Sequence, residues 1–449
     1  MIRCLFVLSI AVPLIFVSRT ADAFSLLRDA EIEHALEIYT ADILDAAHLD
    51  KDAVSLFLVN NPTLNAFVGG GQNIFIHSGL LEEAETPDEV IGVIAHETGH
   101  IIGGHLSRAG KAMKQASQKA TMSFILGALA AAAGSPDAAL AIMMKGQQIA
   151  GAEYMKYSRV QESSADQAAI KLLRRAGKSP DGLRVFMAKL QRLEIAHRQQ
   201  QVSYARSHPL TRERVASLNA ASEQSPFVDV RESQNIQMIH QRVRAKLFGF
   251  LHSFEEVLNR YPQSDQSIPA RYARAISYHR RSMLRPALAE INSMLVDLPD
   301  DGFILELKGQ VYYENAKFEE AVKMYEAAAR QLPHEPLILA ALGVARLDLG
   351  KPQETKKAIT NLNAALAFDP DNILAWLKLA VAYNDTDNPG MANLATAERY
   401  VRMGMLGEAM QQAQRASRKL PEGTTGWIRA RDIQSYIKSM PRRQRRRRG

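Results

Sequence analysis

Residues 95–105 of this chain read AHETGHIIGGH and contain the pattern His96-Glu97-Thr98-Gly99-His100. On an α-helix, residues four apart lie about 40° apart around the axis, so His96 and His100 would present their imidazoles side by side. Two such imidazoles can bind one zinc ion, and the intervening Glu97 can take a proton from a metal-activated water. The alternative is an amphipathic helix that carries two histidines by coincidence.

The start of this helix is marked in the sequence. Thr86-Pro87-Asp88-Glu89 places an N-cap threonine, a proline in the first turn and an acidic residue three positions past the cap. This arrangement is typical of a capping box with a favourable helix dipole. Apolar residues then recur along one stripe, at Val90, Val93, Ile94, Ile101 and Ile102. We therefore expect a buried, rigid helix that holds the metal ligands in place.

The length and the N-terminus bound the protein class. At 449 residues the chain is too long for one core, so two or three domains are expected. Residues 1–23 have the layout of a secretory signal peptide: Arg3, an uncharged run from Cys4 to Ser18, and a small-residue cleavage site at Ala21-Asp22-Ala23. The alternative is an uncleaved anchor, although the run is short for a membrane span. Cys4 is the only cysteine, so the mature protein would have neither disulfides nor thiolate ligands.

The net charge of +7 comes from the two ends of the chain. Six arginines between positions 442 and 448 contribute +6, and Arg3, Arg19 and Asp22 contribute +1, which leaves the mature body neutral. A neutral body argues against a nucleic-acid partner. The Arg-rich tail, 439–449, is predicted to be disordered, with anionic lipid or an acidic partner as its possible contacts.

A short β-hairpin precedes the helix. Asn65–Val68 and Asn73–His77 read as two strands around a Gly-rich turn, and Val54–Val59 reads as a further strand. A free strand edge beside a metal cleft can pair with the backbone of an extended peptide. We predict that Asn73, Ile74, Phe75 and Ile76 form this substrate-binding edge, with a purely structural hairpin as the alternative.

An uncharged segment follows the histidines. Ala120–Pro136 contains no charge, Asp137 interrupts it, and Ala138–Met144 is again apolar. The turn-like sequence around Pro136 predicts a helical hairpin over 110–156, with each arm short for a bilayer span. Three interpretations stay open: a flap beside the active site, a membrane-surface element and a buried core hairpin.

Two later stretches add polar groups. Glu162 and Asp166 lie four apart on a predicted helix from Val160 to Arg175, where they could simply compensate the helix dipole. Glu162 can instead complete a two-His, one-carboxylate site that keeps the fourth position open, and Asp166 can accept a hydrogen bond from a ligating imidazole. His208, before Pro209, and Arg214 could reach the open position, to stabilise an oxyanion or to plug the site.

His105 is expected to be structural. The metzincin pattern needs a third histidine at position 106, which is Leu106 here. On a continuing helix, His105 would point about 140° away from His100.

HETGH, ESSAD and SHPLTRER, in this order, together with the Asn65–Leu81 stretch, resemble the M48 zinc metallopeptidases, a gluzincin group. The resemblance covers roughly Phe24–Leu218. It implies one zinc ion per chain with His96, His100 and Glu162 as ligands, Glu97 as catalytic base and Asp166 as support. Less directly, it implies that His208 assists catalysis or fills the fourth position, with Arg214 beside it.

The C-terminal half has an internal period. Pro299 and Pro333 lie 34 residues apart, which is the tetratricopeptide spacing. Small residues recur at matching points around Gly309 and Gly343, and stacked repeats would form a groove that binds protein segments. A helical bundle with coincidental spacing is the alternative. A fourth repeat is expected to be interrupted by a polar loop at Asp385–Thr396.

These observations predict a mainly α protein with a small β-sheet: a gluzincin-type metalloprotease domain over 24–225, a helical connector over 226–267 and an α-solenoid of tetratricopeptide repeats over 268–438. This combination resembles bacterial periplasmic proteases that act in outer-membrane protein assembly. The resemblance implies unfolded or misassembled protein substrates, the assembly machinery as a partner of the repeat groove, and peripheral membrane contact. The alternatives are a chaperone or scaffold with a latent, His208-plugged metal site, and a membrane-embedded protease that spans the bilayer with Ala120–Met144.

Overall fold

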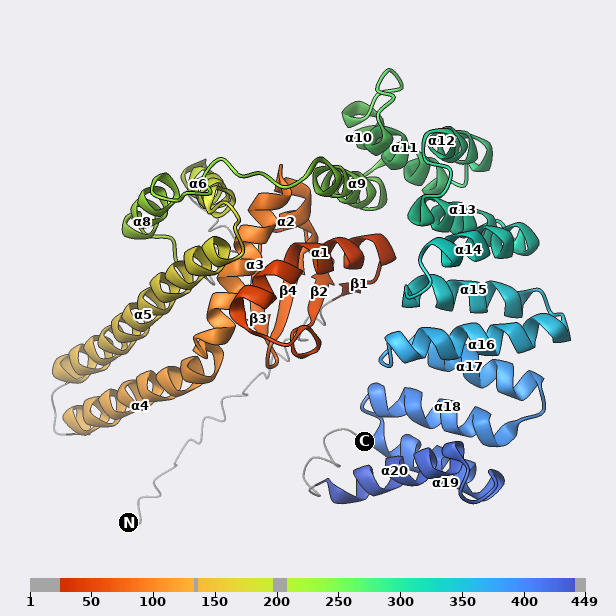
Figure 1. The fold of residues 1–449 in the computed structure, drawn as a ribbon. Coiled ribbons are helices and arrows are strands. Elements are labelled where there is room, and N and C mark those ends of the chain that lie inside the picture. The colour runs from red at the N-terminus through yellow and green to blue at the C-terminus, as the bar shows by residue number, and fades with distance from the viewer. Residues whose placement is uncertain (1–24, 133–135, 197–207, 441–449) are drawn as a thin grey trace, which may run out of the picture.

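The computed structural model describes residues 25–132, 136–196 and 208–440. The predicted signal peptide and the arginines after position 440 lie outside these residues. An N-terminal domain with a small sheet lies beside a curved stack of helix pairs, which runs from α11 to α20 (Figure 1). The expected mainly α fold with a small sheet followed by a helical solenoid is confirmed.

The sheet has four strands in the order β1-β2-β4-β3. Its strands are β1 (Leu26–Leu27), β2 (Leu56–Val59), β3 (Ala66–Gly69) and β4 (Asn73–His77). β4 pairs with β2 in parallel and with β3 antiparallel, so it lies inside the sheet. The prediction that Asn73–Ile76 offers a free edge is therefore wrong, and the edge strand is β3. The β3–β4 hairpin itself is present, because Gly70 takes the left-handed backbone that its tight turn needs.

Helix α3 (Pro87–Ile102) is central to the N-terminal domain. Its start has the predicted capping box, in which Glu89 accepts a hydrogen bond from the Thr86 backbone N–H at 3.3 Å. The helix packs against α1 (Ala30–Ala47), α6 (Asp181–Ala196) and the sheet. Val90, Val93 and Ile94 belong to one core that extends across these elements. Two further helices, α2 (Ser78–Glu83) and α8 (Arg212–Glu223), complete the domain.

The predicted helical hairpin is longer than expected. It consists of α4 (His105–Ala132) and α5 (Pro136–Arg175), which extend away from the domain at the lower left of Figure 1. α5 is one helix of 40 residues, so Glu162 and Asp166 lie within it and not at a helix start. Most of the described hairpin residues beyond the domain are exposed, which excludes a buried core hairpin. Within the described ranges, no helix has the length and hydrophobicity that a membrane crossing requires.

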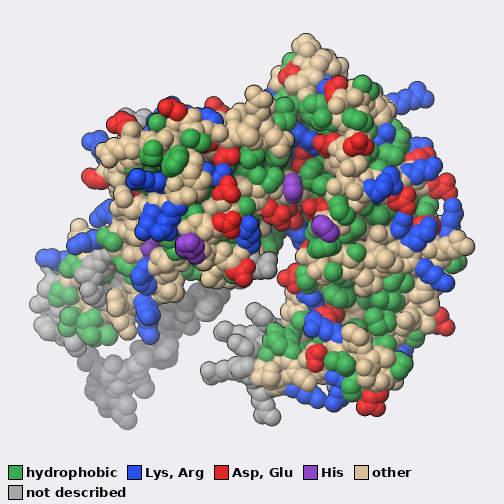
Figure 2. Space-filling model, viewed as in Figure 1, with side chains coloured by type: hydrophobic (Ala, Val, Ile, Leu, Met, Phe, Trp, Pro, Cys, Tyr) green, Lys and Arg blue, Asp and Glu red, His purple; other side chains and the backbone are tan. Residues whose placement is uncertain are grey.

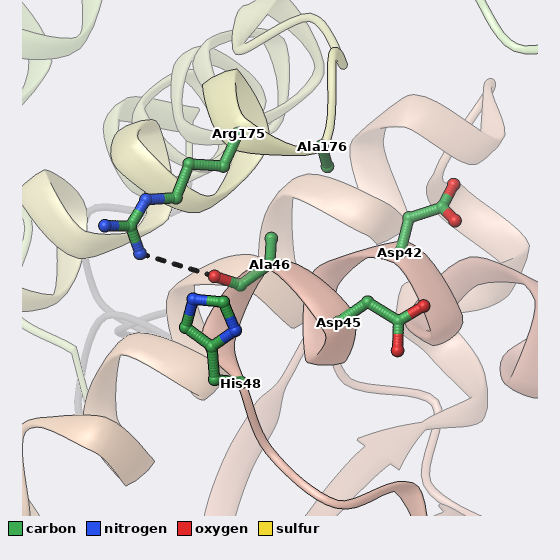
Figure 3. A pocket seen from close by; sticks show the side chains of 6 residues that line it. All are labelled: Asp42, Asp45, Ala46, His48, Arg175 and Ala176. Atoms are coloured by element: carbon green, nitrogen blue, oxygen red, sulfur yellow. Dashed lines mark hydrogen bonds between the residues drawn. The ribbon is translucent and has the colours of Figure 1, made fainter.

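Figure 3 shows a hollow where α1 and α5 end. Arg175 donates a hydrogen bond to the Ala46 carbonyl at 3.4 Å, and His48 ends α1 with a left-handed backbone. Asp42 forms an ion pair with Lys178. These contacts explain the polar groups of this hollow as helix-end stabilisation.

The array consists of five helix pairs. Their first helices begin at residues 268, 302, 336, 373 and 406, so the spacing stays near the tetratricopeptide period. The pairs are α11 (Ile268–Arg280) and α12 (Leu284–Asp297), α13 (Gly302–Glu314) and α14 (Phe318–Gln331), α15 (Pro336–Asp348) and α16 (Pro352–Phe368), α17 (Ile373–Asp385) and α18 (Pro389–Arg402), and α19 (Leu406–Lys419) and α20 (Thr425–Ser439).

The expected polar loop at Asp385–Thr396 is wrong. Most of this segment belongs to α18, which begins at Pro389 after the side chain of Asn388 caps its first turn. Ala392 and Ala395 are buried in the array. The polar residues that suggested a loop form a tight turn, in which Asp387 has a φ of 53°.

Helix α9 (Gln234–Leu251), followed by α10 (Phe254–Arg260), joins the two parts. α9 packs against α1 and α2 on one side and α11 on the other. Lys246, 1% exposed, places its Nζ 2.7 Å from Asp29 and 3.5 Å from Glu31. Glu31 also accepts a hydrogen bond from Tyr272 of α11 at 2.6 Å. The junction is thus a buried ionic cluster.

We expect Lys246→Met to lower the free energy of unfolding by about 3 kcal/mol, because it removes the cation paired with Asp29 and leaves Glu31 with Arg242 as its remaining ion-pair partner. The exposed Lys356→Met is the matched control, with a change of under about 0.5 kcal/mol. Urea denaturation measures both. Equal stability of the two variants would contradict a structural role for the buried cluster.

Candidate metal centre

Four side chains from three parts of the N-terminal domain converge on one point. His96 and His100 come from α3, Glu162 from α5 and His208 from the segment before α8, and their ligand atoms all lie within 4.8 Å of one another. The Nε2 atoms of the two α3 histidines are 3.1 Å apart. Glu162 lies 3.4 Å from each of them, with one carboxylate oxygen per imidazole. The cluster could hold a metal ion.

A glycine brings the two helices together at this point. A Cβ added to Gly99 would lie 2.7 Å from the backbone oxygen of Ala165 on α5. Any larger side chain would therefore push the helices apart. Glycine inside the histidine motif lets α5 approach until Glu162 reaches both imidazoles.

Asp166 and Arg214 support the ligands from behind. Asp166 lies 3.0 Å from Nδ1 of His96, the ring nitrogen that faces away from the cluster. Arg214 donates to both oxygens of Asp166, at 2.7 and 2.8 Å, and to the Pro209 carbonyl. Its Nη1 is also 3.0 Å from Glu162. We expected Arg214 to reach the open position of the site. In the structure its guanidinium instead contacts the carboxylates of Asp166 and Glu162.

These contacts set the protonation of the site. Burial alone would lower the pKa of His96, but hydrogen bonding to Asp166 and Glu162 reverses this and raises it to about 9. Burial, reinforced by the positive His96, lowers the pKa of His100 to about 2. Burial opposes the ionisation of Asp166, and its bonds to Arg214 and His96 more than offset this and lower its pKa. His100 is therefore neutral and ready to bind a metal ion.

His105 is a site residue that sequence reasoning placed elsewhere. Its Nδ1 lies 2.9 Å from Nδ1 of His100, and the residue is buried. The assumption of a continuing helix fails, because α3 ends at Gly103 and Gly104 has a left-handed φ of 58°. The chain turns there and brings His105 back to His100. The two adjacent glycines were the signal for this turn.

His208 completes the cluster. Its Nδ1 lies 3.1 Å from Glu162 and 3.4 Å from Nε2 of His96. Its Nε2 lies 3.2 Å from the backbone oxygen of Ala66 in β3. His208 thus bridges the ligand cluster and the edge strand.

Glu97 lies beside the cluster and is fully buried. Burial raises the pKa of its carboxyl group. Neither oxygen has a hydrogen-bond partner among the residues that the structure describes, and His208 Nε2 lies 3.5 Å from Oε1. A buried carboxyl group with no hydrogen bond beside a ligand cluster is suited to binding a water.

Residues 28–222 match the model of peptidase family M48. This part of the chain is an M48 peptidase domain. Over 422 residues, or 91% of its length, the chain is 25% identical to the beta-barrel assembly-enhancing protease of Escherichia coli K12 and covers 83% of that protein. It is also 29% identical over 193 residues to metalloprotease LoiP of Escherichia coli, covering 43% of this chain and 72% of that one.

The chain is also similar to a thermophilic TPR protein of Thermus thermophilus, at 20% identity and a TM-score of 0.26, covering 43% of this chain and 90% of that one. The repeat assignment rests on the five helix pairs of this chain.

The donor set of the M48 domain fits a metal ion of the zinc type. Two imidazoles and one carboxylate are a common ligand set of catalytic zinc sites, and Asp166 and His105 supply the outer contacts such ligands need. The buried carboxyl group of Glu97 belongs to the same site. Residues 28–222 are thus a metallopeptidase domain of the M48 type.

The cleft at this centre is bounded by the edge strand and the base of the hairpin. Its walls come from β3, α3, α4, α5 and the His208 segment, and its lining residues include Phe67, Val68, Glu97, His100, His105, Tyr157, Glu162 and His208. β3, and not β4, therefore faces the cleft with a free edge.

We expect Gly99→Ala to weaken metal affinity at least about tenfold, because the added methyl group moves α5 and the ligand Glu162. Gly110→Ala is the matched control, since a Cβ there meets nothing within 4 Å. Competition with a chromogenic chelator measures the affinity, and urea denaturation shows whether each variant is folded. Equal affinity in a folded Gly99→Ala would exclude the close approach as a requirement.

Metal binding should release close to one proton at about pH 7, because His96 is protonated in the metal-free protein and its proton must leave. The release should fall towards zero as the pH rises through about 9, the pKa of His96. Titration calorimetry in buffers of different ionisation enthalpy measures it. Asp166→Asn should reduce the release at neutral pH, and an unchanged value would contradict the assignment to His96.

Proposed function

We propose that this chain is a zinc-dependent endopeptidase of the periplasm that cleaves misfolded or stalled outer-membrane proteins. The observation that carries the proposal is the buried carboxyl group of Glu97, which has no hydrogen bond among the described residues and lies beside the His96–His100–Glu162 cluster. Burying such a group is costly, and a hydrolase gains from it because the group can hold the attacking water.

In this proposal His96, His100 and Glu162 hold a zinc ion, which when bound polarises the scissile carbonyl and lowers the pKa of water. Glu97 takes a proton from the attacking water and passes it to the leaving amine. The raised pKa of Glu97 makes its carboxylate a stronger base for this transfer. Asp166, anchored by Arg214, fixes the ring of His96.

His208 controls access to the centre in this proposal. Its Nδ1 lies among the ligand atoms, where water and substrate would otherwise be placed. Two roles follow: His208 plugs the centre at rest, or it moves aside and stabilises the oxyanion during the reaction. The contact with Ala66 favours a plug, because it ties the imidazole to the strand that substrate would pair with.

Substrate binding is assigned to the free edge of β3, Ala66–Gly69. Backbone pairing with this edge would hold an extended peptide beside Glu97 without reading its sequence. Such binding suits unfolded or misassembled protein chains. β4 cannot supply this edge, because it is paired on both sides.

The array is assigned to protein docking, since stacked helix pairs form grooves that bind protein segments. The similarity to a beta-barrel assembly-enhancing protease over most of the chain supports the outer-membrane assembly machinery as the partner. The signal-like N-terminal sequence supports a periplasmic location. The neutral body gives no support to nucleic-acid binding.

A second candidate function is a periplasmic chaperone or scaffold whose metal site is latent. The observation in its favour is the position of His208, which already completes the four-ligand cluster. If His208 filled the fourth position permanently, the protein would act by binding other proteins through the array and not by hydrolysis.

Glu97→Gln should lower the rate of casein hydrolysis at least about a thousandfold while about one zinc per chain is retained, because only the base is lost. The exposed Glu83→Gln is the control and should cleave like wild type. Peptide release and metal analysis measure both properties. Loss of the metal, or hydrolysis that is indifferent to Glu97, would refute the mechanism; a wild type that cuts nothing but protects clients as well as Glu97→Gln would favour the chaperone.

His208→Ala should raise the rate of casein hydrolysis several-fold, because it empties the fourth position. His48→Ala is the matched control, because His48 lies at the end of α1 and does not belong to the cluster. A slower His208→Ala with full zinc content would show that His208 serves the transition state instead of plugging the site.

A further inference from the structure

The α4–α5 hairpin has small residues between its two helices and large apolar residues on its outer surface. The least exposed positions between its arms are small, and they include Ser123 and Gly127 on α4 and Gly146 and Ala150 on α5. A Cβ added to Gly146 would lie 2.0 Å from Cβ of Ser123, so the two helices touch there without room for any side chain. The arms therefore meet through small residues.

The large apolar side chains of the same stretch point outward. Phe124 and Leu140 are each 60% exposed and Met144 is 64% exposed. Met122, Ile125 and Leu126 are exposed beside them. Hydrophobic side chains gather over this part of the hairpin at the lower left of Figure 2. We call these six residues the outer apolar patch.

This distribution is unfavourable in water and favourable against lipid. Water-soluble helix pairs bury their large apolar residues between the helices, and a contiguous exposed patch indicates an interaction surface. Helices in contact with lipid do the reverse, with small residues at the helix contact and large apolar residues facing the acyl chains. The hairpin follows the second pattern.

The positive charge of the hairpin indicates that the membrane is anionic. The arms carry exposed cations on the side of the patch nearer the domain and next to Met144: Arg108, Lys111, Lys114, Lys145, Lys156 and Arg159. Between Leu106 and Ala152 the sequence contains one acidic residue, Asp137. Basic groups beside an apolar patch match the anionic headgroups and the acyl chains of a membrane surface. The same positive charge disfavours a second hairpin as the occupant, because two copies would repel each other.

We propose that the outer apolar patch inserts into the surface of an anionic membrane, with Lys145 near the lipid phosphates and the more distant lysines and arginines of the arms adding to the attraction. The insertion is peripheral, because within the described residues no helix is fit to cross a bilayer. This membrane contact does not depend on the peptidase mechanism proposed above.

The lengths of the two arms fix the distance between the metal centre and the membrane surface. His105 begins α4 at the centre, and Phe124 lies 19 residues further along the helix, a rise of about 28 Å. Glu162 and Leu140 on α5 are separated by 22 residues, a rise of about 33 Å. The two arms agree, so the hairpin would hold the centre roughly 30 Å from the lipid surface.

Vesicle flotation of the purified mature chain tests the proposal. We expect the protein to float with vesicles of equimolar phosphatidylcholine and phosphatidylglycerol at least about ten times more than with pure phosphatidylcholine. The triple variant Phe124→Gln, Leu140→Gln, Met144→Gln should lose at least about tenfold of this binding. The matched control changes three exposed apolar residues of the array, Val296→Gln, Leu374→Gln and Ile428→Gln, and should bind like wild type.

A charge variant separates the two parts of the surface. Lys145→Gln, next to Met144, should weaken binding to the anionic vesicles about fivefold, while Lys356→Gln on the array should not. All changed residues are exposed, and casein hydrolysis and urea denaturation of each variant show that it is folded.

Several results would overturn the proposal. Wild type that does not float, or that floats equally with both vesicle types and in all variants, excludes an anionic membrane as the occupant. A dimer that the hairpin variant loses in size-exclusion chromatography would identify a second copy instead. Loss of protection of an unfolded protein by the hairpin variant, without any flotation of wild type, would identify a polypeptide client.

Discussion

The close crossing of α3 and α5 is the constraint on which the rest of the site depends. Where Gly99 meets the backbone of Ala165, the two helices approach until one carboxylate can reach both α3 histidines. The same approach places Asp166, one turn further along α5, behind His96. A ligand, its support and the two imidazoles are thus fixed by one helix contact. The capping box at Thr86 and the apolar stripe of α3 keep that contact in register.

Buried charged groups are paired at two places in this fold. At the metal centre, Glu162 and Asp166 are surrounded by His96, His208 and Arg214, so that each carboxylate has a positive or donating neighbour. At the junction of the two parts, Lys246 has the same relation to Asp29 and Glu31. The only cysteine lies at position 4, so the described parts of the chain are joined by such clusters and by the apolar cores, without disulfides.

The local sequence predicted those features that depend on a single helix or on a single repeat period. The helix start at Thr86, the side-by-side histidines and the repeat spacing all follow from positions within one or two elements. It was not enough where a backbone turn redirects the chain. His105 was misplaced because a helix was assumed to continue through two glycines, and Asp385–Thr396 was misread because turn residues at its start were extended over the whole segment. Strand order was also beyond reach, since pairing of β4 with the distant β2 is a tertiary contact.

The uninterrupted length of α5 links two places that are otherwise far apart. The helix runs from Pro136 to Arg175 and carries Leu140 and Met144 near one end and Glu162 and Asp166 near the other. In a stiff rod of this kind, a tilt of the outer end that is carried to the crossing with α3 would displace the Glu162 carboxylate within the ligand cluster. Thermodynamic linkage then applies in both directions: an event that fixes the orientation of the rod changes the affinity of the cluster for its ion by the same factor by which the ion favours that orientation.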